Sequence, residues 1–203
     1  MEKPRFEYRG ENRRTISFPL GGIGSGCVGL DGTGRLRDWE IFNRPNKGAL
    51  NGWSHFAVKA ETQGRLIDAR VLHADLLPPY MGDMDRSAKF SDFGFGPHRH
   101  LLSGVPHFRD SVFFGRFPLA DVEFEEERFP GKAKLSAFNP FIPLDDKNSS
   151  LPVAYFTVSL TNEASEALEY TVAFTLDNPT KGARVNRLRQ ERDVTAVELT
   201  SDG

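Results

Sequence analysis

Short apolar or alternating segments, each closed by a turn, follow one another along most of this chain. Residues 53–59 show the period-two pattern of a half-buried strand, with Phe56 and Val58 on the face opposite Trp53, His55, Ala57 and Lys59. Residues 66–72 follow across a turn at 61–64, so we expect these two segments to form a hairpin. Further strands are expected at residues 26–31, 35–42, 111–117, 120–126, 133–138, 153–160, 169–176 and 194–200.

About ten short strands separated by turns predict an all-β fold, a two-sheet β-sandwich with long loops. Asp31-Gly32-Thr33-Gly34 is a second hairpin signal, and residues 169–176 are expected to return from 153–160 across a polar turn. The 17 phenylalanines, 19 glycines and 13 prolines agree with a strand-rich and turn-rich chain. Residues 76–105 are rich in Pro, Gly and Asp and are expected to form one long loop, a kind of loop that often carries function.

The charge and cysteine content exclude several classes of partner and site. A formal net charge of −2 gives no electrostatic reason to expect nucleic acid or an anionic membrane as partner. The single cysteine, Cys27, leaves no intrachain disulfide and no cysteine-rich zinc site. The first residues are charged rather than signal-like, and no apolar run approaches the ~20 residues of a membrane span. We therefore expect a cytoplasmic location without a transmembrane segment.

A glycine-rich tract at residues 21–34 contains a formal G-x-G-x-x-G match at residues 24–29. A dinucleotide site needs a strand before this motif and a helix after it. The turn at residues 31–34 would break such a helix, and no kinase-type lysine strand follows. The tract therefore indicates a tight structural turn rather than a nucleotide site.

Asp38 and Glu40 stand two residues apart within the strand expected at 35–42 and would share a face. Two carboxyl groups can serve glycoside hydrolysis only when they flank the scissile bond. Side chains on one strand point in parallel, so a solvated strand face is the better interpretation.

The triplet His98-Arg99-His100, with His107 seven residues beyond, has the ligand types of a metal site. No acidic residue completes the set, and Arg99 would repel a cation, so we predict no metal. Two readings remain: loop-anchoring or interface hydrogen bonds, or a loop that carries His and Arg towards a sugar cleft. Cys27 is expected to be a small buried apolar residue rather than a nucleophile.

Three blocks resemble one known family. They are residues 18–26 (FPLGGIGSG) with 38–46 (DWEIFNRPN), residues 114–120 (FGRFPLA), and residues 137–144 (AFNPFIPL) followed by 149–153 (SSLPV). Their order and spacing are similar to the N-terminal domain of glycoside hydrolase family 116, the non-lysosomal glucosylceramidases and bacterial β-glucosidases. The resemblance covers most of the chain.

This resemblance implies a β-sandwich that packs against an (α/α)₆ barrel, which holds the catalytic Glu and Asp of a retaining β-glucosidase. Nothing in the sequence matches that barrel. We therefore expect residues 1–203 to be the N-terminal domain, incomplete at its C-terminal end, without the catalytic domain. No catalytic residue, metal or cofactor is assigned, and the chain alone is expected to be inactive.

The expected partners are the catalytic domain of the same protein and a β-glucoside at the domain cleft. The candidates for cleft or interface contact are Trp39, Glu40, Asn43, Arg44, Asn46, His98, Arg99 and His100. This hypothesis predicts an exposed apolar face, on which the catalytic domain would dock, around residues 138–144 or 90–95. The alternative is a stand-alone carbohydrate-binding or interaction module, which predicts no large exposed apolar patch.

Overall fold

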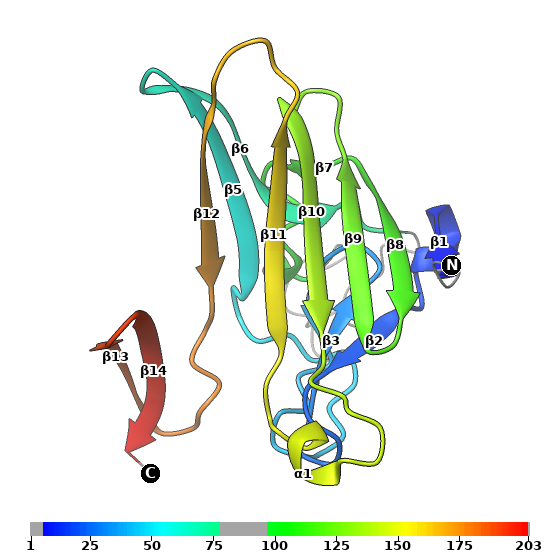
Figure 1. Ribbon diagram of the computed structural model, residues 1–203, viewed down its shortest axis with the longest axis vertical. Coiled ribbons are helices and arrows are strands. Elements are labelled where there is room, and N and C mark those ends of the chain that lie inside the picture. The colour runs from blue at the N-terminus through cyan, green and yellow to red at the C-terminus, as the bar shows by residue number, and fades with distance from the viewer. Residues whose placement is uncertain (1–5, 78–96, 203) are drawn as a thin grey trace, which may run out of the picture.

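Two sheets packed face to face form the body of the protein in the computed structural model, which describes residues 6–77 and 97–202 (Figure 1). One sheet has the strand order β1-β8-β9-β10-β11, and the other has the order β12-β5-β6-β7. The strands of the first sheet are β1 (Phe6–Tyr8), β8 (Asp110–Arg116), β9 (Leu119–Glu125), β10 (Gly131–Phe138) and β11 (Tyr155–Asn162). Those of the second are β5 (His55–Thr62), β6 (Arg65–Ala74), β7 (His107–Phe108) and β12 (Glu169–Thr175). This is the layered architecture of an all-β sandwich.

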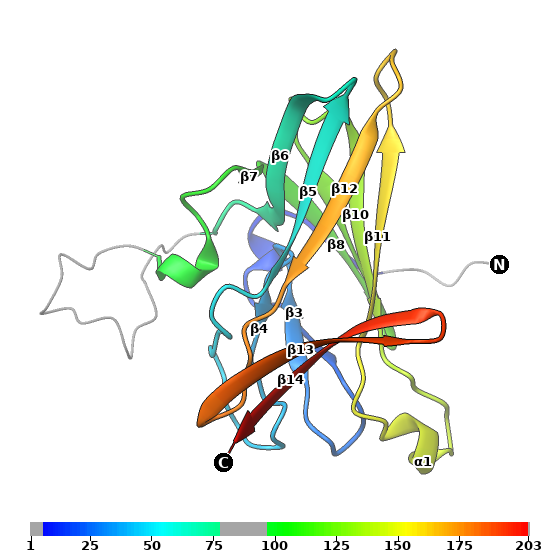
Figure 2. The ribbon, with the colours of Figure 1, turned by 90° about the vertical axis from the view of Figure 1, so that its left-hand side faces the viewer.

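Two smaller sheets lie at one end of the sandwich (Figure 2). One comprises β2 (Ser17–Leu20), β3 (Val28–Asp31) and β4 (Leu36–Arg37), and the other is a hairpin of β13 (Ala183–Glu191) and β14 (Val194–Asp202). The helical elements are the 3₁₀ turns Gly10–Arg13 and Arg99–Leu101 and the short α1 (Asp146–Ser149). Within the described ranges, no helix has the length and apolar character that a membrane crossing requires.

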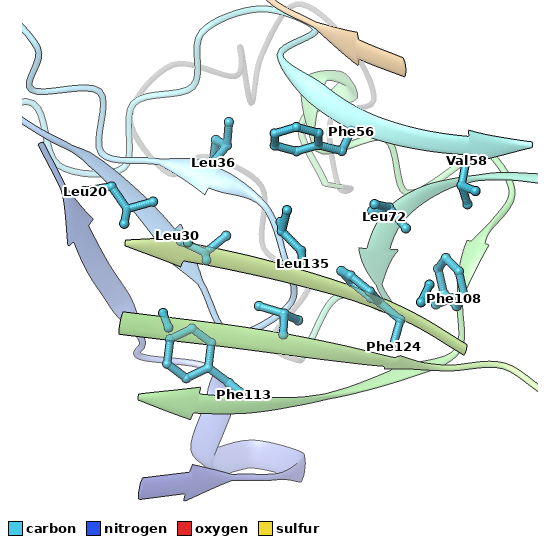
Figure 3. Close-up of a cluster of buried hydrophobic side chains, with 14 of the residues drawn as sticks. Leu20, Leu30, Leu36, Phe56, Val58, Leu72, Phe108, Phe113, Phe124 and Leu135 are labelled. Carbon is cyan, nitrogen blue, oxygen red and sulfur yellow. The ribbon is translucent and has the colours of Figure 1, made fainter. Parts of the chain in front are cut away.

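The core lies between the two sheets and is built by period-two alternation (Figure 3). Every second residue of β5 is buried. In the other sheet, β9 and β10 pair with each other, and their buried residues alternate along each strand in the same way. Aromatic rings fill much of the space: Phe108 packs against Phe124 and Phe129 with ring centroids 5.1 Å apart in both pairs. Burial of such side chains is the main favourable contribution to folding.

The structure confirms the all-β sandwich and most of the expected strands. The hairpin of β5 and β6 forms across the turn near Gly64, and the turn after Asp31 joins β3 to β4. The expected strands at 111–117, 120–126, 133–138, 153–160, 169–176 and 194–200 match β8, β9, β10, β11, β12 and β14 within a few residues.

Three strand predictions were wrong or incomplete. The strand expected at 35–42 ends at Arg37, because Asp38 takes a left-handed conformation with φ of 50°. β12 does not return beside β11: β11 pairs with β10, whereas β12 pairs with β5 in the other sheet. Residues 183–191, for which no strand was expected, form β13.

The loop expected at 76–105 is described only at its two ends. Residues 78–96, including the Phe-rich stretch 90–95, lie outside the described residues. The C-terminal end of the segment is not irregular throughout, because Arg99–Leu101 form a 3₁₀ turn.

Candidate functional site

The glycine-rich segment after β2 folds as a tight, closely packed turn. A Cβ atom on Gly22 would lie 2.4 Å from the carbonyl oxygens of Ser150 and Leu151. At Gly26, φ is +99° and a Cβ would lie 2.5 Å from the carbonyl oxygen of Glu40. Only glycine permits such approach and such a backbone angle. The tract is therefore a structural turn, and no helix follows it that could bind a pyrophosphate.

Asn139, just after β10, fixes the start of this turn. Its side-chain oxygen accepts a hydrogen bond from the amide of Gly21 at 2.6 Å, and its side-chain nitrogen donates to the carbonyl of Pro19, also at 2.6 Å. Asn139 is 5% exposed, so both bonds are shielded from water. They join segments about 120 residues apart in the sequence.

A second loop, residues 38–46, is held against the glycine turn by backbone pairing. The amide of Glu40 donates to the carbonyl of Cys27 at 2.8 Å, and the amide of Cys27 donates to the carbonyl of Glu40 at 3.3 Å. The side-chain amide of Asn46 donates to the carbonyl of Trp39 at 3.0 Å and thereby closes the loop. Three of the sequence candidates, Trp39, Glu40 and Asn46, are thus brought into direct contact.

The Glu40 carboxylate is an organising group of this loop. It accepts the backbone amide of Asn46 at 3.0 Å and the ammonium of Lys47 at 3.2 Å. The hydrogen bond from Asn46, followed by that from Lys47, holds the pKa of Glu40 below its ordinary value. Glu40 is therefore ionised at neutral pH and unsuited to the role of a general acid.

Asp38 does not share a strand face with Glu40, which corrects the interpretation of both residues as a solvated strand face. Asp38 is buried, and its carboxylate accepts the Ser17 hydroxyl and the Gly48 amide. Burial opposes ionisation, but these hydrogen bonds outweigh burial and lower the pKa of Asp38. Both carboxylates hold loops in place and are not a free catalytic pair.

The two loops enclose an open hollow of about 430 Å³, hereafter the glycine hollow. Asn43 and Arg44 lie exposed on its wall, and within the described residues Arg44 has no carboxylate partner. Glu40, Asn43 and Arg44 therefore line one concave surface together with several glycines, and side chains of these types can hydrogen-bond a polyhydroxylated ligand. The lining comprises Pro19, Gly21, Gly22, Ile23, Gly24, Gly26, Cys27, Glu40, Asn43, Arg44, Pro45, Phe117 and Asn139.

Cys27 lies in the loop before β3 rather than in an apolar strand, and it is only partly buried. Its sulfur lies 3.6 Å from the Glu40 carboxylate. Burial, then the negative charge of Glu40, raises the pKa of the Cys27 thiol. The thiol is therefore protonated at neutral pH and is not an activated nucleophile.

A set of exposed apolar side chains, of which Ile23 and Phe117 line the glycine hollow, is hereafter called the apolar rim. Leu119, Phe138 and Tyr155 are cross-strand neighbours, and the rings of Phe138 and Tyr155 stack with centroids 4.5 Å apart. Leu144, just before α1, is fully exposed. The apolar rim comprises Ile23, Phe117, Leu119, Phe138, Ile142, Leu144, Leu151 and Tyr155. Large apolar side chains exposed together are typical of an interaction surface.

Trp39 is half-buried and packs against the core, with its indole N–H donating to the carbonyl of Leu36 at 3.2 Å. The other candidates, His98, Arg99 and His100, lie on a different loop. The ring of His100 contacts both His98 and Trp53, each with centroids 4.7 Å apart. Burial, then the nearby His98 and Arg99, lowers the pKa of His100.

His107 does not join this triplet. Its Nε2 lies 2.6 Å from Asp75 and its Nδ1 lies 2.6 Å from the carbonyl of Val105, so it ties together the two ends of the long segment. Among the described residues, no three His, Cys, Asp or Glu side chains gather in a way that could hold a metal ion.

Of the thirteen residues that line the hollow, only Glu40, Asn43 and Arg44 were sequence candidates, and the other ten, including Cys27, Phe117 and Asn139, were missed. The sequence contains one indication of the role of Asn139, because an asparagine side chain just before a proline at the end of a strand often hydrogen-bonds to the backbone.

A family model matches most of this chain. The model described as "beta-glucosidase 2, glycosyl-hydrolase family 116 N-term" matches residues 17–202. The match spans the glycine hollow, the apolar rim and every strand except β1.

Proposed function

We propose that this chain, which belongs to the N-terminal domain family of glycosyl-hydrolase family 116, packs on the catalytic domain of a β-glycosidase and shapes its sugar cleft. In this proposal the domain is itself non-catalytic. The parent enzyme is a retaining glycosidase of the β-glucosidase or glucosylceramidase type, in carbohydrate metabolism and in the cytoplasm. Its partners are the (α/α)₆ domain and a β-glucoside.

The observation that carries the proposal is the apolar rim, two of whose residues, Ile23 and Phe117, line the glycine hollow. Eight exposed large apolar side chains would be costly for a protein that worked alone, and a docked domain would remove them from water. The alternative, a stand-alone carbohydrate-binding or interaction module, predicts no large exposed apolar patch. Residues 138–144 were expected to belong to an exposed apolar docking face, and Ile142 and Leu144 are exposed there.

Arg44, Asn43 and Glu40 line the hollow and are the residues we propose to face the cleft. Arg44, which has no carboxylate partner among residues 6–77 and 97–202, can donate to sugar hydroxyls or to a carboxylate of the docked domain. Trp39 and Asn46 hold this loop in shape. His98, Arg99 and His100, beside Trp53, are proposed as a second loop at the cleft.

The test is steady-state kinetics of the parent glycosidase on an aryl β-glucoside. Arg44→Ala should lower kcat/KM by about 10- to 100-fold, the range expected for a lost hydrogen bond to a charged group. His100→Ala should raise KM or lower kcat. Arg65→Ala is the matched control, because Arg65 is exposed on the β5–β6 turn, at the opposite end of the sandwich (Figure 1). Unchanged kinetics and stability in Arg44→Ala and His100→Ala would refute the cleft assignment.

A further inference from the structure

One arginine is buried where the 3₁₀ turn Arg99–Leu101 meets the end of β6. Arg35 lies in the turn between β3 and β4 and is 2% exposed. Its Nε donates to the carbonyl of Leu101 at 2.9 Å. Its Nη1 donates to the carbonyl of Ala74 and to the hydroxyl of Thr33, each at 2.7 Å. One side chain therefore joins three segments that lie far apart in the sequence.

The Arg35 guanidinium is a buried cation without a direct anionic partner. In the described part of the chain no carboxylate pairs with it, and its Nη2 has no hydrogen-bond partner. The Asp31 carboxylate, on the same turn, accepts the backbone amides of Thr33 and Arg35 instead. The neighbouring His73 is also buried and adds no negative charge. Burial lowers the pKa of Arg35 to about 10, so the guanidinium is still charged at neutral pH.

Stability alone explains this arrangement poorly. A buried charge loses its hydration, and replacing it by an apolar side chain of similar volume is often neutral or stabilising. The carbonyls of Leu101 and Ala74 compensate Arg35 only in part, because Nη2 stays unpaired. What a planar guanidinium supplies is geometry, since its fixed donor directions hold two acceptors at a set distance from each other. Local rules of this kind are broken most often where a protein serves function.

The 3₁₀ turn that Arg35 holds carries two of the rings proposed for the second cleft loop. The amide of Leu101 donates to the carbonyl of His98 at 2.9 Å, and the amide of His100 donates to the Nδ1 of His98 at 3.2 Å. Beyond the turn, the ring of His100 contacts Trp53. A shift of the Leu101 carbonyl would therefore move these rings together.

We propose that Arg35 is a positioning residue of the parent glycosidase, which fixes residues 98–100 at the sugar cleft through the carbonyl of Leu101. The proposal rests on the proposed function, since it takes this loop to face the cleft. Arg35 is itself buried and acts on the substrate through the loop. Its loss should therefore have no effect on catalysis once the loop has lost its own side chains.

Steady-state kinetics of the parent glycosidase on an aryl β-glucoside test this. Arg35→Gln should lower kcat/KM by about tenfold or more, because small misplacements at a cleft are costly. In an enzyme that carries His98→Ala, Arg99→Ala and His100→Ala, the same change should lower kcat/KM by less than about twofold, because residues that act through one another are not additive. Equal losses in the two backgrounds would overturn the proposal.

Arg13→Gln is the matched control. Arg13 is 3% exposed, and its Nη2 pairs with Asp110 of β8 at 2.6 Å. Its loss should lower the melting temperature, because a paired buried charge is broken, but should change kcat/KM by less than about twofold. If Arg35→Gln lowers kcat/KM no more than Arg13→Gln does, Arg35 is only structural and the proposal is overturned.

A second variant covers the case in which Arg35→Gln does not fold. Arg35→Lys keeps the charge but not the planar fork, so it should also lower kcat/KM in the native background and not in the loop variant. If kcat/KM stays unchanged in folded Arg35→Lys, the proposal is overturned.

The outcomes separate this proposal from the proposed function. If the triple loop variant lowers kcat/KM and the Arg35 variants do not, only the positioning role fails. If neither the triple loop variant nor Arg44→Ala changes the kinetics, the cleft assignment itself fails, and the positioning role fails with it.

Discussion

Replacing Asn139 by alanine should loosen the glycine turn and destabilise the whole protein. The substitution removes both side-chain hydrogen bonds, at 2.6 Å each, and leaves the amide of Gly21 and the carbonyl of Pro19 without partners. The site is 5% exposed, so water compensates poorly. A stranded buried polar group costs about 1–3 kcal/mol, so the two together should cost about 3 kcal/mol.

Urea unfolding followed by the fluorescence of Trp39 and Trp53 measures this loss. With a slope of about 1–3 kcal/mol per molar urea, a loss of about 3 kcal/mol should lower the midpoint by about 1–3 M. Asn148→Ala is the matched control, because the Asn148 side chain is exposed and bonds only to the nearby Asp145. Its unfolding free energy should change by less than about 0.5 kcal/mol. If Asn139→Ala lowers the unfolding free energy no more than Asn148→Ala does, the role assigned to the two hydrogen bonds of Asn139 is refuted.

Two further predictions concern the same loops. Gly22→Ala should destabilise by more than about 2 kcal/mol in urea unfolding, because the new methyl group meets the backbone of Leu151, whereas Gly104→Ala, which meets nothing within 4 Å, should change stability little. Equal effects would contradict the close packing. In the folded protein the pKa values of Asp38 and Glu40 lie below their ordinary values of 3.8 and 4.5. The contribution of the two ionised carboxylates to folding stability is therefore complete above the ordinary pKa values and is lost as the pH falls through the lower pKa values of the folded state. Asp38→Asn should therefore lower stability at pH 7 and reduce the further loss on going to pH 3, and an unchanged pH profile would contradict this.

The sandwich could be predicted from the sequence because its signal is local. Alternation along β5 and the turn at Gly64 specify a half-buried hairpin without reference to the rest of the chain. The strand expected through Asp38 failed for the opposite reason. Its left-handed backbone is stabilised by Ser17 and Gly48, and contacts of that kind leave no periodic trace in a sequence. The sheet that receives β12 is likewise decided by packing of Phe174 on Phe56.

The candidate site could be predicted only in part. Glu40, Asn43 and Arg44 were found because one segment carries them, and the structure places all three at the glycine hollow. Asn139 and Phe117 reach the same hollow from about 100 residues away, so their place depends on the tertiary fold. The resemblance in residues 18–46, 114–120 and 137–153 selects segments that meet at this hollow, although nothing in each segment alone reveals their contact.

The central claim is that the apolar rim is the docking face for the catalytic domain. Hydroxyl-radical footprinting of the intact parent glycosidase tests it most directly, by comparing oxidation of Phe117, Ile142 and Leu144 with that of Leu188 on β13. All four side chains are exposed in this chain. We expect the three rim residues to be protected by about tenfold or more relative to Leu188, since docking removes them from water. Oxidation of the rim as fast as that of Leu188 would contradict the account.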